Sequence, residues 1–495
     1  MELDWLKRWN LYAGKTSAIT DAETGRSFTY AELYERTTAA AAYLAEKYSV
    51  RAGDRVALVA QNELESIVLF FALQRLAATM VPVNFRLTRR EIDHILNDSG
   101  ARLVVFQKAF FEQVDHRPEP LLDMDTFAAD LPSYPHAETG FASEEETPAM
   151  ILYTSGTTGA PKGAILSHRM LFWNSINTTL RLNIVQSDKT VIFLPFFHTG
   201  GWNVLTTPFL HRGAHILLLK KFDADRVLKL TADEKCTLLF GVPTTMDMMS
   251  RSPDFATADL SKLRYAIVGG EPMPLPLIQT WHEKGIPVRQ GYGLTEFGPN
   301  VFSLNEEDAL RKMGSIGFPN FYIEAKVVDD LGREVAPNHI GELVLRGPMM
   351  MTGYWNNARA TADTIRDGWL HSGDLVRQDE DGFFFVVGRK KEMYISGGEN
   401  VYPSEVEQVL RQDEHVREVA VIGVPDEKWG EVGCAYVVPV GPTDANALRA
   451  HCLKNLAKFK IPKHIRIVDA LPKGDSGKIL KRALVERYNQ ETQTH

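Results

Sequence analysis

Cysteine is scarce in this chain: its 495 residues include only Cys236, Cys434 and Cys452, which lie far apart and never in a C-x-x-C spacing. A zinc ribbon or a framework of disulfide bonds would need paired, closely spaced cysteines, so we expect neither. So few thiols are typical of a protein from a reducing compartment. We therefore expect a cytoplasmic protein.

Positive charge and long apolar runs are also lacking. The 55 Lys and Arg against 63 Asp and Glu give a net charge of −8, which argues against a general nucleic-acid binder. The most apolar stretch, SIVLFFALQRLAATMVPV, contains Gln74 and Arg75 and predicts a buried helix leading into a strand rather than a membrane span. MELDWLKRWN predicts no signal peptide, and ETQTH matches no targeting or lipidation signal. We expect no integral membrane segment. Peripheral lipid contact stays open, and the sequence carries no signature of oligomeric state.

Several catalytic motifs are missing as well. No G-x-G-x-x-G follows an expected strand, and neither G-x-S-x-G nor H-E-x-x-H occurs, which weakens the dehydrogenase, hydrolase and metalloprotease hypotheses. The nucleotide loop G-x-x-x-x-G-K-[ST] does not fit residues 153–163, because Ala160 and Pro161 separate Gly159 from Lys162. A phosphate-binding loop at residues 153–163 would therefore have a different sequence motif.

Strand and helix patterns do alternate through most of the chain, and at roughly 100–200 residues per domain its length suggests two to four domains or subdomains. The alternation predicts an α/β fold with a largely parallel sheet, built from two α/β subdomains. From about residue 314 to 387, short strands without a long helix indicate a small β-barrel. After the polar run GRKKE (388–392), helix and strand patterns return and indicate an α+β domain. We therefore divide the chain into domains 1–390 and 391–495.

The segment YTSGTTGAPKG (153–163) follows an apolar run that predicts a strand. Its glycines let backbone N–H groups approach an anion closely, its hydroxyl side chains add donors, and Lys162 adds positive charge. An ordinary Ser/Gly turn is the commoner interpretation of S-G-T-T-G alone, but the whole segment is far more specific. It predicts a phosphate-binding loop.

Three further segments carry polar residues suited to a nucleotide. In QGYGLTEFGP (290–299), Glu296 beside Thr295 suits Mg²⁺ held against phosphate oxygens, and Tyr292 is either a platform for a purine or a core residue. In GWLHSGDL (368–375), Asp374 could bind ribose hydroxyls or be a turn residue. In LPKGDSGKILKR (471–482), Lys478 alone would be an ordinary surface residue.

The segment VVGRKKEMYISGGENVYPSEVE (386–407) joins the polar run to a glycine pair and a helix start. Ser404 and Glu407 predict a capping box for that helix. Helix initiation explains neither the polar run nor the glycine pair.

In this order and at these separations, the five segments resemble the adenylate-forming superfamily of acyl-CoA synthetases, adenylation domains and luciferases. The resemblance extends from FTYAEL near residue 28 to GKILKR near 482. FALQRLAATMVPVNFRLT, ISGGENVYPSEVE and PDEKWGE look most like bacterial fatty-acid or aryl-acid CoA ligases. The resemblance implies that ATP, Mg²⁺ and a carboxylic acid give an acyl-adenylate and pyrophosphate, after which the thiol of coenzyme A takes the acyl group and AMP leaves. It also implies that the small C-terminal domain is mobile and rotates between the two steps.

The resemblance assigns roles to individual residues. It implies that Lys478, Glu296, Thr154 and His198 are the catalytic residues. Lys478 would be the lysine of adenylation, Glu296 would hold Mg²⁺, His198 would stand at the mouth of the acyl pocket, and Lys391 would be the hinge. The residues expected to bind ATP or AMP are Thr154, Ser155, Gly156, Thr157, Thr158, Gly159, Lys162, Gly270, Glu271, Gln290, Gly291, Tyr292, Thr295, Asp374, Arg389 and Lys478.

Coenzyme A has weaker support. The resemblance implies that the backbone of Gly397 and Gly398 lines the pantetheine path, and Trp429, Phe459 and Lys463 are candidates for binding the nucleotide end. A solvated basic helix end explains the lysines near Phe459 equally well.

The acyl pocket should be lined by residues from 196–204, 240–246, 266–271 and 290–297. They include His198, Trp202, Phe240, Val242 and Met246. This lining is apolar and offers no obvious cation for a second carboxylate, so a medium- or long-chain fatty acid or an aromatic monocarboxylic acid fits best. A 2-succinylbenzoate-CoA ligase, a stand-alone adenylation enzyme that loads a carrier protein, and a non-catalytic nucleotide-binding protein stay as alternatives.

Overall fold

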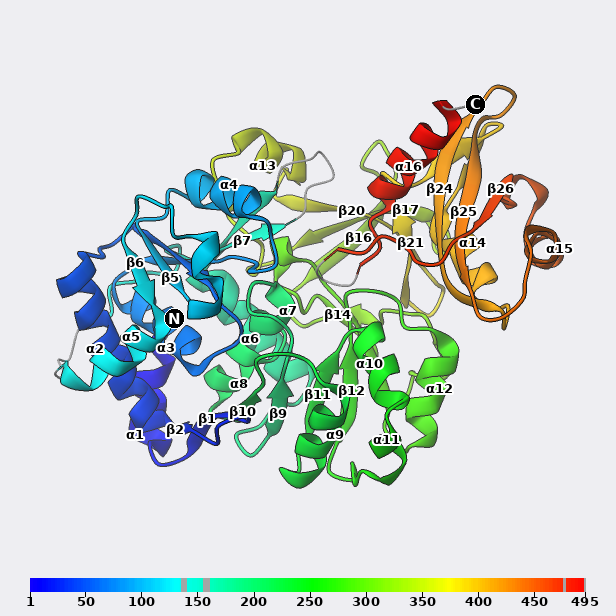
Figure 1. Ribbon diagram of the computed structural model, residues 1–495. Helices are drawn as coiled ribbons and strands as arrows, with labels where there is room; N and C mark the ends of the chain where they lie inside the picture. The colour runs from blue at the N-terminus through cyan, green and yellow to red at the C-terminus, as the bar shows by residue number, and fades with distance from the viewer. Residues whose placement is uncertain (135–139, 155–160, 475–477, 494–495) are drawn as a thin grey trace. The chain divides into compact units, whose positions relative to one another are not determined.

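The computed structural model describes residues 1–134, 140–154, 161–474 and 478–493. The chain packs into two compact units, whose elements are labelled in Figure 1. Unit 1 comprises Met1–Ala325 and Leu345–Leu370, and unit 2 comprises Lys326–Val344 and His371–His495. The boundary crosses β16 (Glu324–Val328), β17 (Ile340–Arg346) and β20 (Trp369–Gln378). The domain division at residue 390 differs from this grouping and stays a prediction.

A seven-stranded sheet in unit 1 carries both ends of the predicted phosphate loop. Its order is β18 (Gly353–Tyr354), β8 (Lys162–Ser167), β7 (Pro148–Thr154), β4 (Thr79–Pro82), β3 (Arg55–Val59), β5 (Leu103–Phe106) and β6 (Leu121–Asp123). The strands from β7 to β6 are parallel, whereas β8 and β18 are antiparallel to their neighbours. Parallel strands need crossover connections, and helices provide them here.

Helix α3 (Leu64–Arg75) is buried along its whole length and leads into β4, as the apolar stretch predicts. Its one buried cation, Arg75, pairs with Asp4 at 2.7 Å, which makes the burial of a guanidinium tolerable. The other helices of this part are α1 (Trp5–Ala13), α2 (Tyr30–Tyr48), α4 (Arg89–Ser99) and α5 (Met124–Asp130). α2 and α4 each begin with a Thr–Glu capping box.

Unit 1 contains two further sheets. The predicted adenine-binding and acyl-pocket residues lie at or shortly after the ends of their strands. One has the order β2 (Ser27–Thr29), β1 (Ser17–Asp21), β10 (His215–Leu218), β9 (Lys189–Ile192). The other has the order β11 (Leu238–Gly241), β12 (Tyr265–Val268), β13 (Val288–Tyr292), β14 (Phe302–Ser303), β15 (Phe318–Pro319). β11, β12 and β13 are parallel, so their carboxyl ends meet at one edge, where open α/β sheets bind ligands.

Helices pack around these sheets and bury a common core that contains Met246, Val268 and Trp281. In Figure 1 they are green, around β11 and β12. They are α9 (Ala224–Asp233), α10 (Pro243–Ser250), α11 (Pro253–Thr257) and α12 (Leu275–Glu283). Unit 1 also contains α6 (His168–Arg181), α7 (Thr199–Asn203), α8 (Thr206–Arg212), α13 (Ala358–Thr364) and β19 (Ile365–Arg366).

Unit 2 is built on two groups of strands. In the first, β16, β17 and β20 are neighbours, and β21 (Phe384–Arg389) pairs with β20. The second has the order β23 (Glu399–Val401), β22 (Tyr394–Ser396), β25 (Gly430–Pro439), β24 (Val416–Asp426), with β26 (His464–Ile467) on β25. In this second group β26 pairs in parallel with β25, while the other pairs are antiparallel. Its helices are α14 (Pro403–Leu410), α15 (Ala445–Asn455) and α16 (Lys481–Gln493). The predicted α/β class, with a large N-terminal part and a smaller C-terminal part, is confirmed.

The capping box predicted from Ser404 and Glu407 is wrong. α14 begins with Pro403 at its first position, and its N-cap Tyr402 makes no side-chain cap bond. A proline there supplies a helical φ and has no N–H to satisfy. Ser404 donates instead to the carbonyl of Val387, and Glu407 accepts from the backbone N–H of Val421 at 2.8 Å.

Candidate active site

The two ends of the predicted phosphate loop are paired across antiparallel strands. Thr154 is the last residue of β7, Lys162 is the first of β8, and they are partners in the ladder. Tyr153 anchors this end of β7, since its hydroxyl donates to Asp98 Oδ2 at 2.6 Å. Burial, with Asp98 as the next cause, raises the pKa of Tyr153, so its hydroxyl stays protonated. Ser155, Gly156, Thr157, Thr158 and Gly159 lie outside the described residues and stay predictions.

Tyr354 is a site residue that the sequence interpretation missed. It lies on β18, beside Ala164 of β8, and its hydroxyl donates to Glu296 Oε1 at 2.8 Å. Its ring centroid is 5.4 Å from Nζ of Lys162, within cation–π range. One tyrosine therefore brings the predicted phosphate lysine and the predicted metal ligand together. The segment GYWNN, an aromatic pair after a glycine, was the available signal.

Glu296 fits a magnesium ion that is shared with phosphate. The residue follows buried Thr295 in a short 3-10 helix, Thr295–Phe297, and its side chain is half-buried. Mg²⁺ in proteins is usually bound through one or two carboxylates plus substrate phosphates and water, so a single carboxylate suffices. Within the described ranges, no cluster of three or more His, Cys, Asp or Glu could form a complete metal site of its own.

The predicted adenine residues come from two neighbouring strand ends. β12 and β13 are parallel and pair Val268 with Gln290, which brings 270–271 near 290–292. Gln290 is buried; its Oε1 accepts from the backbone N–H of Met273 at 3.1 Å, and its Nε2 has no hydrogen-bond partner among the described atoms. Gly270 has φ +87°, a conformation that glycine adopts without strain. An unpartnered buried amide at this edge suits a polar ligand.

The Tyr292 ring has the T-shaped contact that an aromatic core residue would make, with Phe302 at 5.9 Å between centroids. The side chain is nevertheless only half-buried, and Gly291 beside it is also half-buried. Glu271 is exposed. Tyr292 therefore packs on one side and leaves surface for a ligand.

The predicted acyl-pocket residues fall into two groups. His198 is exposed at the N-cap of α7, where its Nδ1 accepts from the backbone N–H of Gly200 at 3.1 Å, and Val242 is half-buried. Trp202 and Met246 are fully buried. Trp202 stacks on Phe196 at 4.3 Å, so it lies inside the core.

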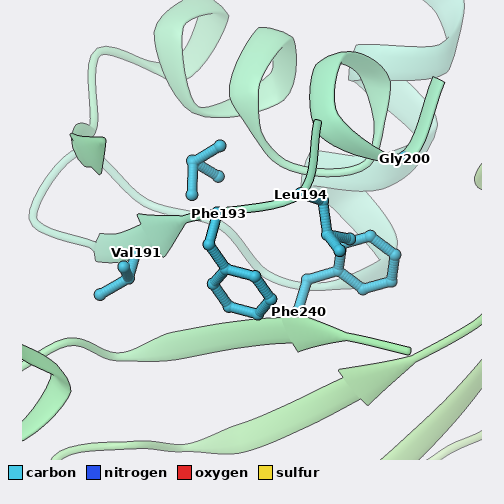
Figure 2. Close-up of a pocket in the computed structure, with 6 residues that line it drawn as sticks. Val191, Phe193, Leu194, Gly200 and Phe240 are labelled. Carbon is cyan, nitrogen blue, oxygen red and sulfur yellow. The ribbon is translucent and has the colours of Figure 1, made fainter. Parts of the chain in front are cut away.

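A small apolar pocket lies between β9 and the end of β11. Figure 2 shows the side chains of Phe193, Leu194 and Phe240 gathered there. Its lining comprises Val191, Ile192, Phe193, Leu194, Gly200 and Phe240. Gly200 and Phe240 belong to the ranges predicted for the acyl pocket.

In unit 2 the two predicted ribose residues are partners across β20 and β21. Arg389 Nε lies 2.8 Å from Asp374 Oδ1. Asp374 is buried, whereas the Arg389 side chain is 54 % exposed. The pair holds a carboxylate in a fixed orientation at the edge of this sheet.

Ion pairs flank the predicted hinge residue Lys391. Before it, Lys390 Nζ lies 2.8 Å from Asp330 and 3.2 Å from Glu342. Its hydrogen bond to Asp330 is the main reason why the pKa of Lys390 is raised. On the other side of Lys391, Glu392 pairs with Lys481 at 2.7 Å. Residue 391 thus stands between two anchored neighbours.

Lys478 is exposed and lies next to the start of α16. Its carbonyl accepts from the backbone N–H of Gly474 at 2.7 Å. Residues 475–477 lie outside the described part of the chain.

The candidate coenzyme A residues are partly brought together. Gly397 and Gly398 both have positive φ, and the Gly397 N–H donates to the carbonyl of Trp429 at 2.8 Å. A Cβ on Gly397 would come 2.7 Å from the Trp429 ring, so only glycine fits. Phe459 is 39 % exposed. Lys463 is paired with Asp426, which leaves less of its charge for a phosphate.

Comparison with known proteins identifies this arrangement. The family model described as AMP-binding enzyme matches residues 6–355, and the AMP-binding enzyme C-terminal domain matches 405–478. The chain belongs to the AMP-binding enzyme family. As the resemblance predicts, it is an AMP-forming acid–thiol ligase, and the expected carboxylic acid, ATP and coenzyme A are consistent with this family.

Relatives of this AMP-binding enzyme act on different acids. This chain is 39% identical over 475 residues to the feruloyl-CoA synthase of Amycolatopsis sp, and the alignment covers 94% of both chains. It is 38% identical to the indoleacetate–CoA ligase of Aromatoleum aromaticum, which covers 100% of both. The solved o-succinylbenzoate CoA synthetase of Bacillus subtilis, in complex with its acyl-adenylate OSB-AMP, superposes with a TM-score of 0.89 at 32% identity, covering 97% of both chains. Of the helices in the described residues, none has the length and apolarity needed to cross a bilayer.

Proposed function

We propose that the protein joins an aromatic or fatty monocarboxylic acid to coenzyme A in two steps. ATP and the acid first give an acyl-adenylate and pyrophosphate. The coenzyme A thiol then attacks the acyl carbon, a C–S bond forms, and the C–O bond to AMP breaks. A carboxylate is a poor acyl donor, whereas AMP is a good leaving group, which is the reason for consuming ATP.

The observation that carries this proposal is the convergence of Lys162 and Glu296 on Tyr354. A cation and a carboxylate held by one side chain suit a polyphosphate accompanied by a metal ion. Lys162 binds phosphate oxygens directly, and Tyr354 orients Glu296. Mg²⁺ held by Glu296 would neutralise charge on the phosphates.

The remaining ATP contacts follow from the strand ends. The edge of β12 and β13 supplies the adenine site, with the Gln290 amide as an available donor. The oriented Asp374 carboxylate accepts hydrogen bonds from ribose hydroxyls, with Arg389 beside it. Lys478 supplies the cation that stabilises charge as carboxylate and α-phosphate react.

The proposed acid is apolar because the pocket at Gly200 and Phe240 is lined only by apolar side chains and glycine. Feruloyl and indoleacetate relatives favour an aromatic acid, and a relative described as a long-chain fatty-acid CoA ligase, at 35% identity, keeps the aliphatic class in the proposal. The B. subtilis structure favours 2-succinylbenzoate as the second candidate.

Pyrophosphate release from ATP and Mg²⁺, with and without coenzyme A, tests the proposal. The acids would be C4–C18 fatty acids, benzoates, cinnamates, indoleacetate and 2-succinylbenzoate. Acid-dependent release with turnover only when coenzyme A is present supports the ligase. Release that stalls after one turnover despite coenzyme A favours a carrier-protein acceptor, and no release with any acid contradicts the adenylation chemistry.

A further inference from the structure

Phe240 lies next to the last residue of β11, at the ligand-binding edge of the parallel strands. Its side chain is 8 % exposed and forms one wall of the small pocket behind it (Figure 2). The other walls come from Gly200 and from residues 191–194. The strand ends that carry the predicted adenylate site, 269–271 and 290–292, contribute nothing to that lining.

Two glycines hold the Phe240 ring in a narrow space. A Cβ on Gly200 would come 3.7 Å from Cε1 of the ring, and a Cβ on Gly269 would come 3.7 Å from Cε2. Both edges of the ring therefore lie beside glycine backbone. A methyl group added at either glycine would be in ordinary van der Waals contact with the ring. The same Cβ on Gly269 would lie 3.4 Å from the carbonyl oxygen of Gly291. We refer to the strip beside the ring that the backbones of Gly269 and Gly291 border as the slot.

We propose that Phe240 is the floor of the acyl site and limits the acid to a compact, flat aryl group. This inference rests on the proposed function and names the substrate class within it. An acid whose carboxylate is at the strand ends meets the ring before it can reach the pocket lined by Val191 and Phe193. A planar ring stacks against Phe240 between backbone walls. A long alkyl chain finds no continuation.

The test is the selectivity of Phe240→Ala. Removing the ring joins the slot to the pocket behind it, so kcat/KM for pyrophosphate release with dodecanoate should rise relative to cinnamate by roughly tenfold or more, the scale of discrimination that a hydrophobic pocket provides. Wild type should prefer cinnamates and benzoates. Phe240→Leu, which keeps most of the packing, should shift the ratio in the same direction by less.

Phe255→Ala is the matched control, because Phe255 is also 8 % exposed and packs against Trp281, away from the pocket lining. It should lose comparable core packing while its acid selectivity stays that of wild type. Gly269→Ala gives an opposite test: the added methyl narrows the slot and should lower kcat/KM for the bulkier aryl acids more than for butyrate.

Three results would overturn the assignment of Phe240 while leaving the ligase intact. They are a wild-type preference for C12–C18 acids, a Phe240→Ala selectivity that equals that of Phe255→Ala, and the same selectivity in Phe240→Leu and wild type. Absence of pyrophosphate release by wild type with every acid is a different outcome, because it removes the proposed function itself.

Discussion

The hydroxyl of Tyr354 donates to Glu296 Oε1 at 2.8 Å, while the Tyr354 ring lies 5.4 Å from Nζ of Lys162. Along the chain, Glu296 lies 58 positions before Tyr354 and Lys162 lies 192 positions before it. The antiparallel pairing of β18 with β8 explains how they meet, since Tyr354 and Ala164 are ladder partners. A neutral side chain thus sets the geometry between two opposite charges.

Replacing Tyr354 by Phe should weaken the magnesium dependence of adenylation. The ring stays under Lys162, but Glu296 loses the donor that orients it. We expect the Mg²⁺ concentration for half-maximal pyrophosphate release to rise, and the rate at limiting Mg²⁺ to fall about tenfold, since a hydrogen bond to a charged group contributes about 1.5–3 kcal/mol. Tyr322→Phe, at a 45 % exposed tyrosine of the same unit, is the control. An unchanged Mg²⁺ titration would contradict the role of Tyr354.

Lys478→Ala should separate the two half-reactions. Loss of a cation aimed at developing charge should lower acyl-adenylate formation by about 100-fold or more. Thioester formation from preformed acyl-adenylate should stay near wild type, because that step uses no charge from this lysine. Arg482→Ala, at a 69 % exposed side chain of α16, controls for disturbance of the helix. Equal losses in both half-reactions would remove Lys478 from its assigned role.

Lys391→Pro should have the opposite pattern. The ion pairs of Lys390 and Glu392 anchor both neighbours, so rotation of the chain would concentrate at residue 391. Proline locks φ near −65° and should block that rotation, sparing adenylation and impairing thioester formation. Lys391→Ala, which keeps a free φ, is the control. If both half-reactions survive in the proline variant, the hinge is elsewhere.

Buried His168 should make stability depend on pH. Burial lowers its pKa from 6.5 to about 4. Between those values the unfolded chain binds a proton that the native protein does not, so this contribution is complete above pH 6.5 and is lost as the pH falls toward 4. The free energy of unfolding should drop by about 2 kcal/mol from this site between pH 7 and pH 5.

Urea unfolding of wild type and His168→Gln at both pH values measures this effect. The variant should lose less stability on acidification, whereas His94→Gln, at an exposed position, should keep the wild-type difference. A His168 variant with the full wild-type pH dependence would show that other groups cause it.

Local sequence was enough to predict some elements of this protein. The apolar stretch around Gln74 and Arg75 predicted α3 and β4, since a helix that is apolar on nearly every face must be buried. The apolar run before YTSGTTGAPKG predicted the strand that ends at Thr154, whereas the strand that begins at Lys162 was not predicted. The same local reasoning failed at Ser404 and Glu407, because both side chains bond to distant strands. Ser404 donates to the carbonyl of Val387 in β21, and Glu407 accepts from the backbone N–H of Val421 in β24.

The amino-acid sequence by itself determined the family and the kinds of side chain available for phosphate, metal and carboxylate chemistry. Tertiary structure alone decided that Tyr354 orients Glu296, that Trp202 and Met246 lie in the core, and that Phe240 closes the pocket beside Gly200. The physical reason is that these relationships depend on which strands become neighbours and on how rings fill the space between backbones. Strand pairing and packing join residues that are distant in the chain, and no local pattern records either.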